Sequence, residues 1–140
     1  MSDALPDLKQ KLKLLFGTLS KEKLIEWGER YLQAGWVSDS LDFFVEAEHG
    51  EGFKQVRELA VKEGDAFILR RCLKEMDVNA DEGEWKALGE NALKLGKLQF
   101  AREGFRLAGE RKMLDRVDAM INPPKEEEET DLPMQAQGEA

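Results

Sequence analysis

The sequence predicts an all-α fold: a short right-handed α-solenoid of three helix–turn–helix repeats with one flanking helix at each end. Helix-forming residues such as Leu, Ala, Glu, Lys and Arg dominate a chain of 140 residues that is 41% hydrophobic and 36% charged. Proline, which interrupts helices, is scarce at four residues. A pattern of glycines and aromatic residues recurs along the chain, which is typical of stacked repeats.

The recurrence is clearest between residues 28–47 and residues 89–108, which align without gaps. A weaker copy, residues 57–76, aligns through Gly64 and gives glycine spacings of 29 and 32 residues. The three copies therefore predict three repeat units of about thirty residues each. The identical pairs in the two clearest copies are Gly28 and Gly89, Glu29 and Glu90, Leu32 and Leu93, Gly35 and Gly96, Phe44 and Phe105, and Ala47 and Ala108.

A flanking helix over residues 5–16 is expected to open the array, with Gly17 ending it. Its apolar residues recur at helical spacing and are predicted to share one face. A stacked array needs such a terminal helix, because an end unit otherwise exposes its apolar side. The residues of this face are Leu5, Leu8, Leu12, Leu15 and Phe16.

The first unit, residues 21–49, is predicted to contain two helices separated by a turn. Ser20 caps the first helix and Gly35 ends it, because glycine readily adopts the left-handed conformation found at helix C-termini. Ser38 or Asp39 is expected to cap the second helix.

The second unit, residues 50–78, is expected to turn at Gly64, after which Asp65 caps the next helix. The third unit, residues 82–109, is expected to turn at Gly96. Both units therefore repeat the helix–turn–helix plan of the first.

A second flanking helix is predicted over residues 110–121, before an Asn-Pro-Pro sequence that stops it. Residues 1–122 would then form the folded repeat domain. Residues 123–140 have no apolar period and carry six acidic residues and one lysine, so a disordered acidic tail is expected there. Such a tail either solvates the protein or recruits a basic partner. The apolar face of the final helix consists of Met113, Leu114, Val117, Met120 and Ile121.

Charge and composition narrow the function classes. The net charge is −8 and no basic stripe is present, which disfavours nucleic-acid binding. No run approaches the roughly 18 apolar residues of a membrane-spanning helix, and the N-terminus lacks the apolar stretch of a signal peptide. Cys72 is the single cysteine and is expected to be a buried hydrophobe. These features favour a cytoplasmic protein without membrane attachment.

The third unit resembles a tetratricopeptide repeat, whose unit of about 34 residues carries the pattern W-x₂-L-G-x₂-Y…A-x₃-F. Ala92 stands where the pattern has tyrosine, the units are shorter, and Arg57 replaces the small glycine in the second unit. The resemblance implies a docking scaffold whose first helices line a concave groove. The matching residues are Trp85, Leu88, Gly89, Ala101, Phe105 and Ala108, and in the first unit Gly28, Tyr31, Gly35, Phe44 and Ala47.

Catalytic and cofactor motifs are missing from the sequence. It contains no GxGxxG or GxxxxGK[ST] motif, and Gly28 and Gly89 are expected instead to let helices approach closely. His49 and Cys72, each the only residue of its type, cannot supply a structural zinc site, which needs four ligands. We therefore expect no enzyme activity, no metal and no cofactor.

Equivalent glutamates and aliphatic residues suggest a binding surface. By the resemblance, the glutamates face the concave groove, with the aliphatic residues one turn later. Lysines stand four residues before two of the glutamates and are expected to pair with them. Trp36, in the turn after Gly35, either packs on the N-terminal helix or contacts a partner. The predicted groove consists of Glu29, Leu32, Lys54, Glu58, Val61, Lys86, Glu90, Leu93 and Trp36.

Two functions follow from this surface. The first is an adaptor or scaffold that binds a peptide or partner helix with apolar and basic side chains. The alternative is a self-associating structural subunit that uses the same surfaces to form a homo-oligomer. A solvated helix face is the simpler interpretation of the same glutamates.

Overall fold

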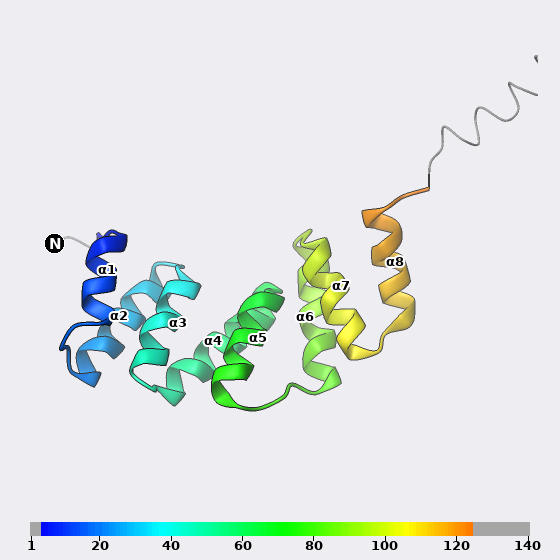
Figure 1. The fold of residues 1–140 in the computed structure, drawn as a ribbon. Coiled ribbons are helices and arrows are strands. Elements are labelled where there is room, and N and C mark those ends of the chain that lie inside the picture. The colour runs from blue at the N-terminus through cyan, green and yellow to red at the C-terminus, as the bar shows by residue number, and fades with distance from the viewer. Residues whose placement is uncertain (1–3, 125–140) are drawn as a thin grey trace, which may run out of the picture.

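The computed structural model describes residues 4–124, which contain eight α-helices and no strands. The predicted all-α class is confirmed for this part of the chain. Figure 1 shows the helices following one another along an elongated molecule, with the first and last at opposite ends. The helices are α1 (Leu8–Leu15), α2 (Lys21–Gln33), α3 (Val37–Glu46), α4 (Gly50–Glu63), α5 (Ala66–Met76), α6 (Glu82–Lys94), α7 (Leu98–Ala108) and α8 (Arg111–Ile121).

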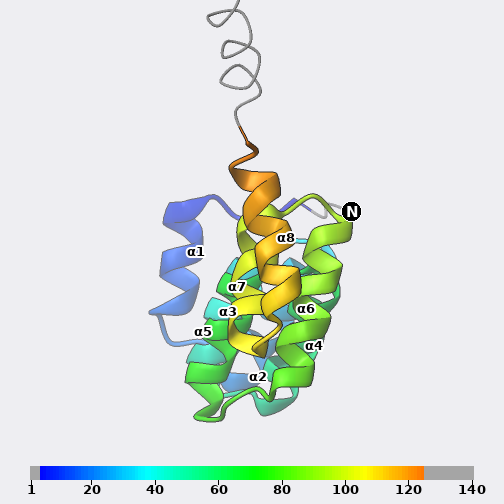
Figure 2. The same cartoon turned by 90° about the vertical axis from the view of Figure 1, so that its right-hand side faces the viewer.

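The helices pack as two layers. Consecutive pairs form three hairpins, α2 with α3, α4 with α5, and α6 with α7. Within one layer, α4 packs between α2 and α6; within the other, α1, α3, α5 and α7 are in contact in that order. The view along the long axis shows α4 and α6 on one side and α1 and α5 on the other, with α8 covering the end (Figure 2). The positions of Glu29, Glu58 and Glu90 thus fall on neighbouring helices of one layer.

Local signals account for several helix ends. The side chains of Ser20, Asp65 and Asp81 accept hydrogen bonds from backbone N–H groups in the first turns of α2, α5 and α6. Gly64 ends α4 in the left-handed conformation, with φ of 67°. The prediction for α3 was wrong, because Trp36, with no side-chain cap, occupies the N-cap position that was expected for Ser38 or Asp39.

Glycines permit close contact inside the hairpins, as expected for Gly28 and Gly89. A Cβ atom on Gly28 would lie 2.5 Å from the Phe44 ring, and one on Gly89 would lie 3.0 Å from the Phe105 ring. Gly104 takes part in the same contact, because its added Cβ would lie 2.8 Å from the backbone of Gly89. Gly28 and Gly89 therefore have equivalent packing roles in the first and third hairpins.

The N-terminal helix contradicts the predicted apolar face. Leu15 is buried as expected, but Leu8 and Phe16 are 69% and 72% exposed. Lys11 is buried instead, because its ammonium group bonds to the Asp39 and Asp42 carboxylates of α3. These ion pairs set which side of α1 faces the protein.

The buried side chains form three core clusters, a central one spanning α3 to α7 and a smaller one toward each end. Cys72 is fully buried in the central cluster, which confirms its predicted role as a hydrophobe. No helix within residues 4–124 combines the length and the apolar character needed to cross a bilayer. The described residues end at Pro124, so nearly all of the predicted acidic tail, residues 125–140, lies outside them.

Candidate partner-binding surfaces

The glutamates of the predicted groove are exposed, and the aliphatic residues beside them are half-buried. Leu32 and Val61 pack against the central core cluster, whereas Leu93 packs against the C-terminal one. Each aliphatic side chain is thus partly buried in the core and partly exposed to solvent, and it lies one helical turn after a glutamate. We call Glu29, Glu58 and Glu90 the acidic row.

Polar contacts fix two helices of this layer against each other. The Asn91 side-chain amide on α6 donates to the backbone carbonyl of Val61 on α4 at 2.8 Å. The Arg57 guanidinium on α4 forms two hydrogen bonds of 2.7 and 2.8 Å with the Glu84 carboxylate on α6. The hydrogen bonds with Glu84 raise the pKa of Arg57, so the guanidinium stays charged. Glu58 and Glu90 are therefore carried on helices whose relative position is well determined.

The expected pairing of lysines within the row does not occur. Across residues 4–124, no ion pair joins Lys54 to Glu58 or Lys86 to Glu90. The Lys86 ammonium lies 3.6 Å from the Glu110 carboxylate, just before α8, because the stacking of the helices brings that acid into reach. The carboxylates of the acidic row take part in no ion pair within residues 4–124, so they are available to solvent or to a partner.

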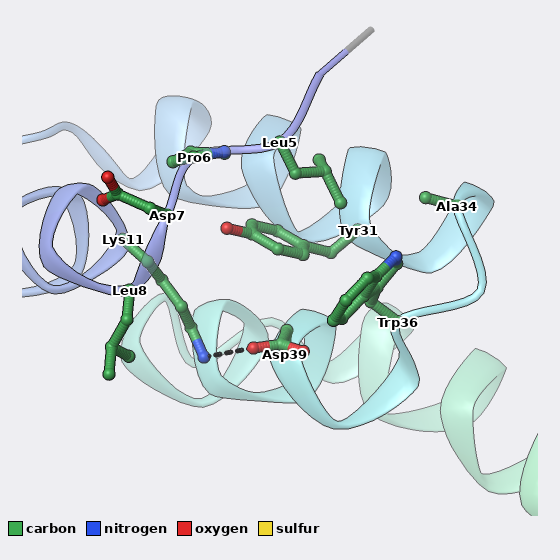
Figure 3. Close-up of a pocket in the computed structure, with 9 residues that line it drawn as sticks. All are labelled: Leu5, Pro6, Asp7, Leu8, Lys11, Tyr31, Ala34, Trp36 and Asp39. Atoms are coloured by element: carbon green, nitrogen blue, oxygen red, sulfur yellow. Dashed lines mark hydrogen bonds and ion pairs between the residues drawn. The ribbon is translucent and has the colours of Figure 1, made fainter.

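A second surface lies at the N-terminal end of the molecule, where a pocket of about 550 Å³ opens between the N-terminal segment, α2 and α3. Figure 3 shows Trp36 on one side of it and Pro6 and Asp7 on the other. Of the predicted groove residues, only Trp36 lines this pocket, and its side chain is 57% exposed. Trp36 thus lines the pocket that the N-terminal segment encloses and still presents most of its surface to solvent.

Tyr31 lies within the same pocket and is 3% exposed. Its ring stacks on Phe43, with the ring centroids 5.3 Å apart. Its hydroxyl group is buried without a hydrogen-bond partner in the described structure. Burial, and then the charge of Asp39, raise the pKa of Tyr31, so the hydroxyl remains a hydrogen-bond donor at neutral pH.

Beneath the pocket, a charged network joins α1, α3 and α5. The Lys11 ammonium lies 2.6 Å from both the Asp39 and the Asp42 carboxylates, and Asp42 also binds the Arg71 guanidinium. Burial alone would lower the pKa of Lys11, but these hydrogen bonds outweigh it and the pKa is raised. Burial would likewise raise the pKa of Asp42, but hydrogen bonds from Lys11 and Arg71 lower it. Lys11 is therefore already neutralised and offers no free positive charge to a ligand.

Reactive groups are sparse in the described part of the chain. Burial raises the pKa of the Cys72 thiol to about 11, so it is protonated and unreactive at neutral pH. The His49 ring lies half-buried against Phe44, with the ring centroids 5.5 Å apart. Within residues 4–124, no three His, Cys, Asp or Glu residues gather as metal ligands.

Sequence reasoning missed Tyr31, Lys11 and Asp39 as parts of a pocket. Tyr31 matched a core position of the repeat, and nothing in the pattern shows that its hydroxyl lacks a partner. One feature of Lys11 could have been noticed: it lies on the apolar side of a short helix, and a lysine that is buried needs an acidic partner. Its two acidic partners, Asp39 and Asp42, lie 28 and 31 residues further along the chain, and no local pattern identifies them.

Comparison with known proteins identified no relative of this chain. The sequence matches no protein-family model, no curated protein and no solved structure.

Proposed function

We propose that this chain is a short tetratricopeptide-like repeat array that binds a peptide or partner helix without catalysis. The observation that supports this most is the acidic row, three exposed glutamates at equivalent positions on α2, α4 and α6. These helices lie in one layer, and half-buried aliphatic side chains follow each glutamate one turn later. Such a surface complements a segment with apolar and basic side chains.

The unpaired state of the row strengthens the electrostatic part of the proposal. Because Lys86 pairs with Glu110, it does not neutralise Glu90. A basic segment docked along the row meets carboxylates that form no ion pair with any residue of the described range. Charge pairs at an exposed surface of this kind contribute more to association rate and selectivity than to affinity, and salt weakens them.

Selection of short random peptides displayed on phage against the full chain tests the proposal. The selected peptides are expected to combine apolar with basic residues. Charge reversal of the acidic row, Glu29→Lys, Glu58→Lys and Glu90→Lys together, is expected to weaken their binding about tenfold or more. The matched control reverses three exposed glutamates outside the row: Glu46, Glu63 and Glu75. Equal binding by the row variant and the wild type would refute the acidic row as the binding surface, and a selection that enriches no peptide would refute peptide binding itself.

A second candidate function, self-association, is favoured by α1. Leu8, Leu12 and Phe16 follow one another at intervals of four residues and are 69%, 43% and 72% exposed. This apolar stripe lies at the end of the array, where a second copy has access (Figure 1). Sedimentation at several concentrations distinguishes the functions. A dimer that Phe16→Glu dissociates supports self-association, and a strict monomer excludes it.

A further inference from the structure

The N-terminal pocket combines features that the acidic row does not share. It is concave, its volume of about 550 Å³ falls within the range of about 300–1,000 Å³ typical of ligand sites, and aromatic rings form part of its wall. Leu5, Pro6 and Leu8 supply the aliphatic part of the wall, and Trp36 supplies an exposed aromatic face (Figure 3). An apolar group that enters it is surrounded by apolar side chains from several directions.

The Tyr31 hydroxyl marks the polar requirement of an occupant. A buried hydroxyl without a partner destabilises the empty protein, by a penalty that an acceptor on an occupant would remove. Figure 3 shows the hydroxyl end of Tyr31 turned toward Pro6 and Asp7 and away from Trp36. Leu5 and Pro6 precede α1 and line the pocket on this side. Because the Tyr31 hydroxyl is buried, this segment has to move before an acceptor can reach it.

Charge at the pocket excludes an acidic occupant. Its charged lining residues are Asp7, Lys11 and Asp39. Lys11 is bound by Asp39 and Asp42, so none of the lining residues within 4–124 offers a free cation, and the Asp7 carboxylate adds a further negative charge. An anionic ligand would be repelled, whereas a cationic or neutral one is tolerated or attracted.

A peptide can supply an apolar group for the pocket, an acceptor for the Tyr31 hydroxyl and a neutral or positive charge. A large apolar side chain fills the space beside Trp36, and a backbone carbonyl accepts from the Tyr31 hydroxyl. A backbone N–H group or a flanking lysine or arginine of the peptide would face the Asp7 carboxylate, since Asp39 is already paired with Lys11. Exposed aromatic residues at the mouth of a pocket are common anchors for such segments.

We propose that this pocket is an anchor site for a large apolar side chain of a basic peptide. Trp36 covers that side chain, and the Tyr31 hydroxyl donates a hydrogen bond to a backbone carbonyl of the peptide. The inference depends on the proposed peptide-binding function and adds a specific anchoring position to it. The acidic row and the pocket are separate sets of residues, so each can be removed without the other.

The experiment uses the full chain and the peptides selected on it. Trp36→Ala is expected to weaken binding about 30-fold, the loss typical of an interface hot spot. Phe67→Ala is the matched control, because Phe67 is 59% exposed, close to the 57% of Trp36, and does not line the pocket. Its binding is expected to stay within twofold of the wild type. Equal binding by Trp36→Ala and the wild type, or selection of acidic peptides, would overturn the inference.

Tyr31→Phe separates ligand recognition from a structural role. Removing the unpartnered hydroxyl is expected to leave the thermal midpoint unchanged or higher, while peptide binding weakens about fivefold through the lost hydrogen bond. Unchanged peptide binding by this variant would overturn the role assigned to the hydroxyl.

The two proposals fail in distinguishable ways. Loss of binding on charge reversal of the acidic row, with binding intact in Trp36→Ala, refutes the pocket and leaves the proposed function standing. Loss in Trp36→Ala alone refutes the row and supports the pocket. A selection that enriches no peptide refutes both.

Discussion

Replacing Gly104 with alanine is expected to destabilise the protein, although alanine is the better helix former. Gly104 lies within α7, and the added Cβ would stand 2.8 Å from the Cα and N atoms of Gly89 and from the Trp85 carbonyl oxygen on α6. These are backbone atoms, so no side-chain rotation can relieve the contact. The two helices must separate by roughly 1 Å to restore an ordinary contact of about 3.5–4.0 Å.

The net effect follows from two opposing contributions. Overpacking a well-packed contact costs about 1–3 kcal/mol, whereas the change from glycine to alanine inside a helix contributes about 1 kcal/mol in the other direction. We expect the free energy of unfolding to fall by about 1 kcal/mol, which for a domain of this size corresponds to a decrease of roughly 3–5 °C in the thermal midpoint.

Urea and thermal denaturation followed by circular dichroism measure this difference. Gly50→Ala is the matched control, because a Cβ at Gly50 meets no atom within 4 Å and its φ is not in the left-handed region. That variant is expected to be as stable as the wild type or slightly more stable. A Gly104→Ala protein that is as stable as Gly50→Ala would refute the close contact between α6 and α7.

Three further predictions concern charge and reactivity. Because hydrogen bonds hold the pKa of Asp42 below its ordinary value, its contribution to stability is present above about pH 4 and is lost as the pH falls through the lowered pKa. Urea midpoints measured across this range should therefore decrease less steeply with acid in Asp42→Asn, and identical slopes would contradict the network. Cys72, with a pKa of about 11, should react with a thiol reagent far more slowly in the native protein than in urea, whereas rapid native reaction would show that it is accessible. A double-mutant cycle of Arg57→Ala and Glu84→Ala should give a coupling energy of about 1 kcal/mol, and no coupling would mean that the pair does not join α4 to α6.

The helices and several of their ends were predictable because the signals are local. A capping side chain such as Asp65 bonds to a backbone group three residues away, and Gly64 supplies the left-handed residue at the end of its own helix. Such features need no knowledge of the tertiary structure. The close contact of Gly28 with Phe44 was also accessible, because Gly89 and Phe105 repeat it at the same spacing.

Features that depend on distant residues were predicted incorrectly or not at all. Hydrophobic spacing placed Leu8 and Phe16 on the inward face of the first helix, but ion pairs with α3 turn Lys11 inward instead. Gly104 approaches Gly89 on the preceding helix, a contact that no local pattern around Gly104 identifies. Each outcome is decided by a partner at least fifteen residues away in sequence.

Trp27 is only half-buried. It packs against the N-terminal core cluster, and the Arg30 guanidinium lies 4.7 Å from its ring centre. This position lies near the N-terminal end of the array, where fewer helices are available to cover the side chain. The N-terminal pocket was unpredictable for a related reason, since three separate segments form it.

Amide NMR spectra recorded during titration with a selected peptide test peptide docking on this array most directly. Docking along the acidic row predicts shifts concentrated around Glu29, Glu58 and Glu90 on α2, α4 and α6. Shifts confined to α3, α5 and α7, or no shift at saturating peptide, would contradict it.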